Sequence, residues 1–373
     1  MKFLSRLRRF FNECLPTFTK TALAVFALCA LTNIIAVISA PFADFVNFYI
    51  SSPLRAVFAH LTGWIPFSLA ETVVLFMPVM VVALFYSCIK RLRENGEATR
   101  FVAVFFGVTL LVYSAYFITS GVACRTSPIE DKLSLSRCDV STSELEAVAG
   151  ELAEELCDIC DEVDFSYMGF SNMPYDLSEL VHKLCDSYDE MSNEYTFLPR
   201  LRVAVKPIML SVPMTYTHIS GIYTFFTGEA NINTNFPDYT LPYTVAHEMA
   251  HQRGVIREDE ANFIAFLTCF ESDDAYIRYS GLLGLYEYVA SALYSADPDS
   301  YAELVSKLDL RIRYELVAYS EFYSAYRDSA AADISNSVND FYLKAQGQTA
   351  GTRSYGQVVD LAVAYYKKGG IIQ

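Results

Sequence analysis

"VAHEMAHQRGVIREDEANFIAFLTC", residues 245–269, holds two of the chain's five histidines four residues apart, with a glutamate directly after the first. His247, Glu248 and His251 form the pattern HExxH. In a helix the two histidines project from one face, one turn apart, so both imidazoles can bind one metal ion. Glu248 can accept a proton from water without being a ligand. The stretch therefore predicts a helix that carries a zinc site for hydrolysis.

The residues around the motif fit a buried helix. Val245, Ala246, Met249 and Ala250 are apolar or small, Gly254 can end the helix in the left-handed conformation, and the proline-bearing "FPDYTLPYTV" marks its start. The alternative is an ordinary soluble helix with two histidines. The pattern arises by chance in roughly one such chain in a few hundred.

A catalytic zinc site takes three protein ligands and leaves one position open. "REDEAN" predicts a second helix beginning near Ile256, on which Glu258 and Asn262 share a face. We expect Glu258 to bind the metal and Asn262 to hydrogen-bond a ligand imidazole. Glu260 stays open as the alternative third ligand, because the turn between the helices decides between the two glutamates.

"HEMAH" followed by "EDEAN" resembles the zincin superfamily of metallopeptidases, particularly gluzincin-type members in which an E-x-x-x-D or E-x-x-x-N helix follows HExxH. "GIYTFFTGEANINTNFPDYTLPYTVAHEMAHQRGVIREDEANF" is similar to a family of bacterial multi-pass membrane proteins with a domain of unknown function. The resemblance implies His247, His251 and Glu258 as ligands and Glu248 as base. The chain departs from the gluzincin pattern in having Asn262 where aspartate is common, and in a much shorter gap to the third ligand than in the thermolysin-like branch.

Charge divides the 373 residues into two parts. Residues 1–123 hold ten Lys/Arg and five Asp/Glu, whereas residues 124–373 hold eighteen and thirty-eight. The first part contains three uncharged runs of 23, 18 and 24 residues, at 21–43, 72–89 and 101–124. Because roughly 20 helical residues cross a bilayer core, we predict three transmembrane helices, of which the second is the shortest and contains Pro78.

Cations decide the predicted orientation. They precede the first run and fill the short loop between the second and third, so the positive-inside rule places the N-terminus in the cytoplasm. A cleaved signal peptide is the alternative for the first run, but no small-residue cleavage signature closes it and two more runs follow. We predict a cytoplasmic N-terminus (1–19), a membrane domain (20–123) and an extracytoplasmic domain (124–373) of a multi-pass cell-membrane protein.

Local patterns predict the fold class of residues 124–373. "STSELEAVAGELAEELCDICDEV" begins with a capping box, Ser141 and Glu144, and like "YDLSELVHKLCDSYDEM" it repeats apolar residues at helical spacing. Strands are expected in "LRVAVKPIMLS" and "SGIYTFFTGEANINTNF", and helices from about residue 244 onward. The prediction is an α+β, mainly helical, zincin-like domain.

Weaker signals concern single residues. Glu229 is either a substrate contact beside a sheet edge or a solvated strand residue. Four side chains are open as stabilisers of a tetrahedral oxyanion: His218, Tyr216, Tyr223 and Tyr243. His60 and His182 are expected to be structural or exposed. Six cysteines follow residue 123, namely Cys124, Cys138, Cys157, Cys160, Cys185 and Cys269, and we expect them to be buried or locally paired.

Two functions remain as hypotheses. The first is a membrane-anchored zinc metallopeptidase that hydrolyses a peptide or protein outside the membrane. The second is a non-catalytic zinc-binding sensor or binding protein of the bacterial cell envelope, for which Glu248 has no use. The bilayer is an expected partner and nucleic acid is not, since the acidic second part repels phosphates. Charges such as Arg253, Arg257 and Asp259 argue against a site within the bilayer.

Overall fold

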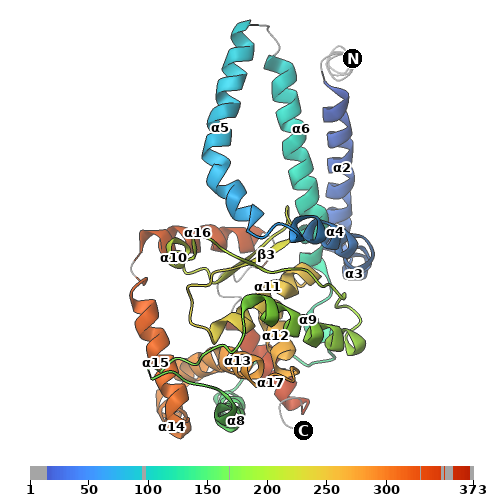
Figure 1. The fold of residues 1–373 in the computed structure, drawn as a ribbon. Coiled ribbons are helices and arrows are strands. Elements are labelled where there is room, and N and C mark those ends of the chain that lie inside the picture. The colour runs from blue at the N-terminus through green and yellow to red at the C-terminus, as the bar shows by residue number, and fades with distance from the viewer. Residues whose placement is uncertain are drawn as a thin grey trace.

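Three long apolar helices extend from one end of the molecule (Figure 1). They are α2 (Thr17–Ile38), α5 (Leu69–Glu94) and α6 (Ala98–Tyr116) in a computed structural model that describes residues 15–94, 98–167, 169–327, 329–345, 348 and 356–369. Segments Thr17–Ile38, Leu69–Arg91 and Thr99–Arg125 are long and apolar enough to cross a membrane. The prediction of three such helices is confirmed, and Pro78 lies inside α5 without ending it.

The three helices expose apolar side chains as lipid-facing helices do. Ile34, Val82 and Phe85 are 62, 68 and 70 % exposed. Helices α2 and α6 pack closely, since the Thr19 hydroxyl donates to the carbonyl of Ala103 at 2.8 Å and a Cβ on Gly107 would lie 2.9 Å from the Phe18 ring. Such apolar surface costs free energy in water and none in a bilayer.

The segment between the first two long helices is helical and turns back onto the rest of the molecule. It forms α3 (Ala40–Val46), the π-helical turn η1 (Asn47–Ser51) and α4 (Ser52–Gly63). The buried guanidinium of Arg55 donates to the carbonyl oxygens of Gln252 at 3.2 Å and of Thr119 at 2.7 Å. Thr119 belongs to the π-helical turn η2 (Phe117–Gly121), which continues the third long helix. Arg55 therefore connects the apolar helices to the segment around Gln252.

The remaining elements are mostly helices. They are η3 (Ala123–Arg125), α7 (Ile129–Lys132), α8 (Thr142–Ile159), η4 (Cys160–Glu162), α9 (Leu177–Glu194), α10 (Ser211–Thr215), α11 (Thr240–Arg253), α12 (Glu258–Phe270), α13 (Ala275–Ala296), α14 (Pro298–Lys307), α15 (Leu310–Ser324), α16 (Ala330–Ala345) and α17 (Val358–Lys367). The chain is thus mainly helical, as expected. Leu152, Leu184, Phe263 and Ile277 are fully buried in a core that α8, α9, α12 and α13 share.

The two amphipathic helices predicted in the acidic part are confirmed. Ser141 and Glu144 form the expected capping box at the start of α8, in which each side chain accepts a hydrogen bond from the other residue's backbone N–H. Asp176 caps α9 through the N–H of Glu179. Among the described cysteines none forms a disulfide, and Cys157 and Cys160 of the CxxC are both free. His60 and His182 are exposed.

The strands are present but shorter than the predicted segments. β1 (Lys206–Pro207) runs parallel to β3 (Glu229–Ile232), and β2 (Gly221–Thr224) runs antiparallel to it, in the order β1-β3-β2. The end of the first predicted segment turns instead into α10 at Ser211. β2 is therefore an edge strand of the described sheet.

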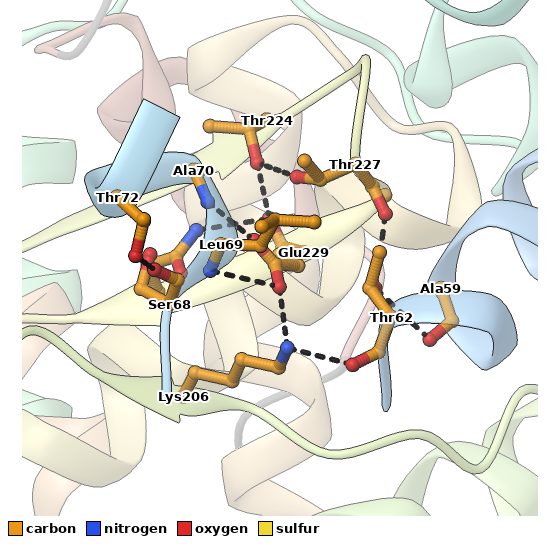
Figure 2. Close-up of polar contacts among 12 residues, drawn as sticks. Ala59, Thr62, Ser68, Leu69, Ala70, Thr72, Lys206, Thr224, Thr227 and Glu229 are labelled. Carbon is orange, nitrogen blue, oxygen red and sulfur yellow. Dashed lines mark hydrogen bonds and ion pairs between the residues drawn. The ribbon is translucent and has the colours of Figure 1, made fainter. Parts of the chain in front are cut away.

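Glu229 joins this sheet to the second long helix (Figure 2). Its carboxylate accepts the backbone N–H groups of Leu69 at 3.2 Å and Ala70 at 2.9 Å, at the start of α5, and pairs with the ammonium of Lys206. Lys206 also donates to the carbonyl of Thr62 at 2.8 Å. Glu229 is 2 % exposed, so the expectation of a solvated strand residue is wrong. Its carboxylate is enclosed by these donors and does not face a substrate.

Candidate metal centre

Helices α11 and α12 form the helix–turn–helix predicted around the HExxH motif. Gly254 ends α11 with a left-handed φ of 94°, and its N–H donates to the carbonyl of His251 at 3.0 Å. A Cβ at Gly254 would lie 2.1 Å from a guanidinium nitrogen of Arg55. Glycine is therefore required here both for the backbone conformation and for the close approach of Arg55. Four residues later α12 begins, with Glu258 as its first residue.

This turn brings the side chains of His247, His251 and Glu258 together. One potential ligand atom of each lies within 4.8 Å of the others. The Glu258 Oε2 atom is 3.2 Å from Nε2 of His247 and 3.6 Å from Nε2 of His251. Two ligands of one tetrahedral zinc lie about 3.3 Å apart, given zinc–ligand distances of about 2.0–2.2 Å. The spacing of the three groups thus fits a single zinc ion.

The second ring nitrogen of His251 supports this fit. Nδ1 lies 2.8 Å from the carbonyl oxygen of Val255, so it carries the proton, and the lone pair of Nε2 faces Glu258. A nitrogen lone pair and a carboxylate oxygen in contact require a cation between them. Either a proton or a metal ion can take that place.

Charge and burial oppose each other at the three groups. Burial alone lowers the pKa of His251, but Glu258 outweighs it and raises the pKa to about 9. Burial raises the pKa of Glu258, while the two imidazoles lower it well below its usual range. The carboxylate is therefore ionised, as a metal ligand must be.

Glu248 lies beside the cluster and is not part of it. Its side chain is buried, and its Oε2 atom has no hydrogen-bond partner among the described residues. Burial raises its pKa, and the neighbouring imidazoles oppose that rise. Strand β2 passes directly over it, because a Cβ on Gly221 would lie 2.6 Å from Glu248 Oε1. An unpartnered carboxylate oxygen is therefore available next to the three groups.

Glu260, the alternative third ligand, points elsewhere. Its Oε1 atom accepts the backbone N–H of Ile129 at 2.9 Å and pairs with the guanidinium of Arg257 at 2.6 Å. It fixes the short helix α7 against α12. The structure thus brings Glu258, and not Glu260, to the histidines.

Asn262 does not make the hydrogen bond expected of it. Its Nδ2 atom donates to the hydroxyl of Tyr288 at 3.4 Å, and Nδ1 of His247 has no partner among the described residues. The expected bond between Asn262 and an imidazole is therefore wrong. The amide instead helps to line a cavity next to His247.

Of the four residues considered for an oxyanion, Tyr223 differs from the others. Its hydroxyl is buried without a partner among the described residues, and its ring centre is 6.3 Å from that of His251. Burial raises its pKa to about 12, so it remains a donor at neutral pH. The Tyr243 hydroxyl donates to the Asn262 carbonyl, His218 Nε2 lies 2.9 Å from the Tyr326 carbonyl, and Tyr216 is 44 % exposed.

Two cavities meet at His247 and Glu248. One, of about 630 Å³, has a mixed lining in which polar side chains such as Thr244, Ser280, Glu287 and Asn336 alternate with aromatic ones. The other, of about 740 Å³, is lined mainly by apolar side chains and also contains His251 and Glu258. Helix α16 contributes Ser335 and Asn339 to both cavities. Sequence patterns did not indicate this role of α16. Ser335 and Asn339 follow the HExxH motif by more than 80 positions, so no local pattern connects them to it.

The fold defines a mainly helical protein with three helices apolar and long enough to cross a membrane, and the site brings two imidazoles and a carboxylate to one point. Residues 47–363 match the model of DUF3810, a family described as a protein of unknown function. The chain belongs to this family, which agrees with the expected membership in a family of unknown function. No curated protein and no solved structure matches the chain.

Proposed function

We propose that this protein is a membrane-anchored, zinc-dependent metallopeptidase of the HExxH type. The observation that carries the proposal is the convergence of His247, His251 and Glu258 next to the unpartnered carboxylate oxygen of Glu248. The two histidines and Glu258 would hold zinc and leave a position open. The zincin-like arrangement inferred from "HEMAH" and "EDEAN" belongs to this proposal.

When bound, zinc would activate water for attack on a carbonyl carbon at neutral pH. Glu248 would accept a proton from the attacking water and pass it to the leaving amine. The Tyr223 hydroxyl, on a ring whose centre is 6.3 Å from that of His251, would donate a hydrogen bond to the oxygen on which charge develops. The side chains thus provide a base and a hydrogen-bond donor.

The sheet supports a peptide as substrate. β2 is an edge strand and lies over Glu248, so an extended chain can add to its free edge within reach of the base. Gly221 has no side chain between that edge and the carboxylate. A larger residue there would cover Glu248.

We also propose that the part of the chain after about residue 124 lies outside the cytoplasmic membrane. Lys2, Arg6 and Arg9 precede the first span, and Lys90 and Arg91 follow the second, which favours these ends for the cytoplasm. A phosphatase fused after the last residue should be active and a fluorescent protein that folds poorly outside the cytoplasm should stay dark. The reverse pattern would contradict an extracytoplasmic peptidase.

The function is tested by replacing the base and keeping the ligands. In cells expressing Glu248→Gln, we expect zinc content and melting temperature to match the wild type, and proteolytic products to fall by about 10²- to 10⁴-fold. The readout is an unbiased comparison of envelope proteins and released peptides by mass spectrometry. Glu179→Gln, at an exposed position on α9, is the control.

The alternative, a zinc-binding sensor or binding protein, predicts another outcome. Wild type and Glu248→Gln would then give the same products and the same phenotype, whereas His247→Ala and His251→Ala would be defective. That combination would make the metal structural and reject the peptidase.

A further inference from the structure

We infer that the substrate is a polypeptide anchored in the membrane and that the site cuts it in the stretch next to its apolar span. This inference rests on the proposed peptidase function and names its substrate class. The position and chemistry of the two cavities that meet at His247 and Glu248 carry it.

The apolar cavity lies against the end of the third span. Ser120, in the π-helical turn that continues α6, lines it. Phe225, which also lines it, packs its ring edge-on against the ring of Tyr116 at 5.4 Å between centres. Tyr116 is the last residue of α6. The cavity therefore opens where the apolar helices meet the rest of the chain.

Both walls of this cavity expose apolar side chains. Ile222 and Phe226, on β2 and the turn after it, are 42 and 39 % exposed, and Ile334 and Val338 on α16 are 66 and 62 % exposed. In water such walls are unfavourable, whereas an apolar chain that lies between them removes them from water. The cavity is therefore suited to an apolar segment.

Helix α16 has the pattern of a helix that lies at a membrane surface. Ile334, Val338 and Phe341 follow one another at four and three residues, and Phe341 is 76 % exposed. Figure 1 shows α16 crosswise to the three long helices, at the level where α5 begins. In this orientation the exposed apolar side chains of α16 would lie in the bilayer interface, between the head groups and the acyl chains. The apolar cavity beside α16 then faces the bilayer.

The second cavity distinguishes an anchored polypeptide from a lipid. It leads away from the same His247 and Glu248, and its lining includes Thr244, Ser280 and Asn336. A chain that crosses the site thus meets mainly apolar walls on one side and, on the other, mixed walls that carry many hydroxyl and amide groups. A polypeptide that leaves a bilayer has this sequence of chemistries, whereas a free lipid needs the apolar side alone and a soluble peptide the polar side alone.

The test uses the full chain in phosphatidylcholine vesicles, with zinc present and a photo-crosslinking amino acid placed at Val338. The probe is a peptide library with one apolar span of about 20 residues followed by a polar tail of randomised sequence. The competitor is the same tail library without the span. The control position is Val317 on α15, which is 54 % exposed and lies on a helix that Figure 1 shows away from the spans.

We expect Val338 to crosslink the anchored peptides in the first residues after the span, about tenfold more than the soluble library and than Val317, because burying one or two apolar side chains is worth at least that factor. Ile334→Asp should lower this crosslinking about tenfold, and Val317→Asp should leave it unchanged. Zinc content should be the same in both variants, which separates a change in the cavity from a loss of fold.

Equal crosslinking of anchored and soluble peptides would overturn the inference. So would crosslinks from Val338 to lipid chains alone, since a lipid would then fill the cavity. Crosslinking does not require hydrolysis. If anchored peptides are captured after their span but no cleavage is found, the proposed peptidase function fails and the assignment of the cavity stands.

Discussion

Lys206 and Glu229 form a buried ion pair that connects the sheet to the second apolar helix. Their side chains are 3 and 1 % exposed. Figure 2 shows the carboxylate between the ammonium group and the first N–H groups of α5. The positive end of the α5 helix dipole adds to the stabilisation of this carboxylate. The start of α5, one of the three helices apolar enough to cross a membrane, is thus bound to the strand that lies next to β2.

Removing one member of this pair should destabilise the protein strongly. Glu229→Gln leaves the Lys206 ammonium buried without a counter-charge, which costs about 3–5 kcal/mol. The double variant Lys206→Met/Glu229→Gln should recover part of the loss. Thermal unfolding of the detergent-solubilised chain measures both. Glu303→Gln, in an exposed pair with Lys307 whose side chains are each 67 % exposed, should change the melting temperature little. Equal effects at the two positions would contradict the role of Glu229.

Replacing Arg55, which lies in the segment between α2 and α5, should lower the stability of the protein. Burial lowers its pKa to about 10, so it remains charged at neutral pH. Arg55→Met leaves the carbonyl groups of Gln252 and Thr119 without their donor, at about 1–3 kcal/mol for each. We expect a melting temperature several degrees lower. Arg202→Met, at a side chain that is 52 % exposed, is the matched control and should have a small effect.

Metal analysis separates the two acidic candidates for the third ligand. Glu258→Gln should lose most of the zinc, because the amide is a poor ligand beside the two imidazoles. Glu260→Gln should keep about one zinc per chain and melt at a lower temperature, since it weakens the contacts to Ile129 and Arg257. Zinc retained in the first variant and lost in the second would overturn the assignment.

The close contact between β2 and Glu248 can be tested by a substitution that adds a single methyl group. Gly221→Ala places a Cβ 2.6 Å from Glu248 Oε1, so the carboxylate must move. We expect normal zinc content and a loss of hydrolysis close to that of Glu248→Gln. Gly150→Ala on α8 is the control, because a Cβ there meets no atom within 4 Å and should stabilise the helix by about 0.5–1 kcal/mol. Unchanged hydrolysis in Gly221→Ala would argue against Glu248 as the base.

Glu287 should make stability depend on pH. Burial raises its pKa from 4.5 to about 7, against the hydrogen bond from the Tyr239 hydroxyl, and the nearby Glu315 adds to the rise. The folded state therefore holds this proton more tightly than the unfolded state, and the free energy of unfolding falls as pH rises from 4.5 to about 7. Glu287→Gln removes this loss. The variant should be more stable than wild type by about 1–3 kcal/mol above pH 7, allowing for partial exposure of the side chain, and differ little near pH 4.5.

Melting curves of wild type and Glu287→Gln at pH 5 and pH 8 measure this difference. Glu321→Gln on α15, at an exposed position, should show none. A difference that is larger at pH 5 than at pH 8 would have the wrong sign for a carboxyl group that stays protonated in the folded state.

The sequence by itself determined those features that follow from a single stretch of chain. An uncharged run of about 20 residues must form a helix in lipid to satisfy its backbone, so the three apolar helices were predictable. The same holds for the capping box of Ser141 and Glu144, the left-handed Gly254 and the shared face of His247 and His251. Each depends on dihedral preferences and side-chain spacing within a few residues. Glu258 was expected as the third ligand, but the choice between it and Glu260 depended on the turn between α11 and α12, which the sequence did not settle.

Tertiary structure alone decided which distant residues meet. The partners Arg55 and Gln252 are 197 positions apart, and Glu229 and Leu69 are 160 positions apart. No local pattern tells a buried glutamate from a solvated one, since the difference lies in donors that the fold brings from elsewhere. The same reason explains why Asn262 bonds to Tyr288 instead of an imidazole, and why α16 lies beside the HExxH helix. Burying a polar side chain costs free energy unless hydrogen-bond or charge partners offset the loss of water. Those partners are brought together by packing of the whole chain.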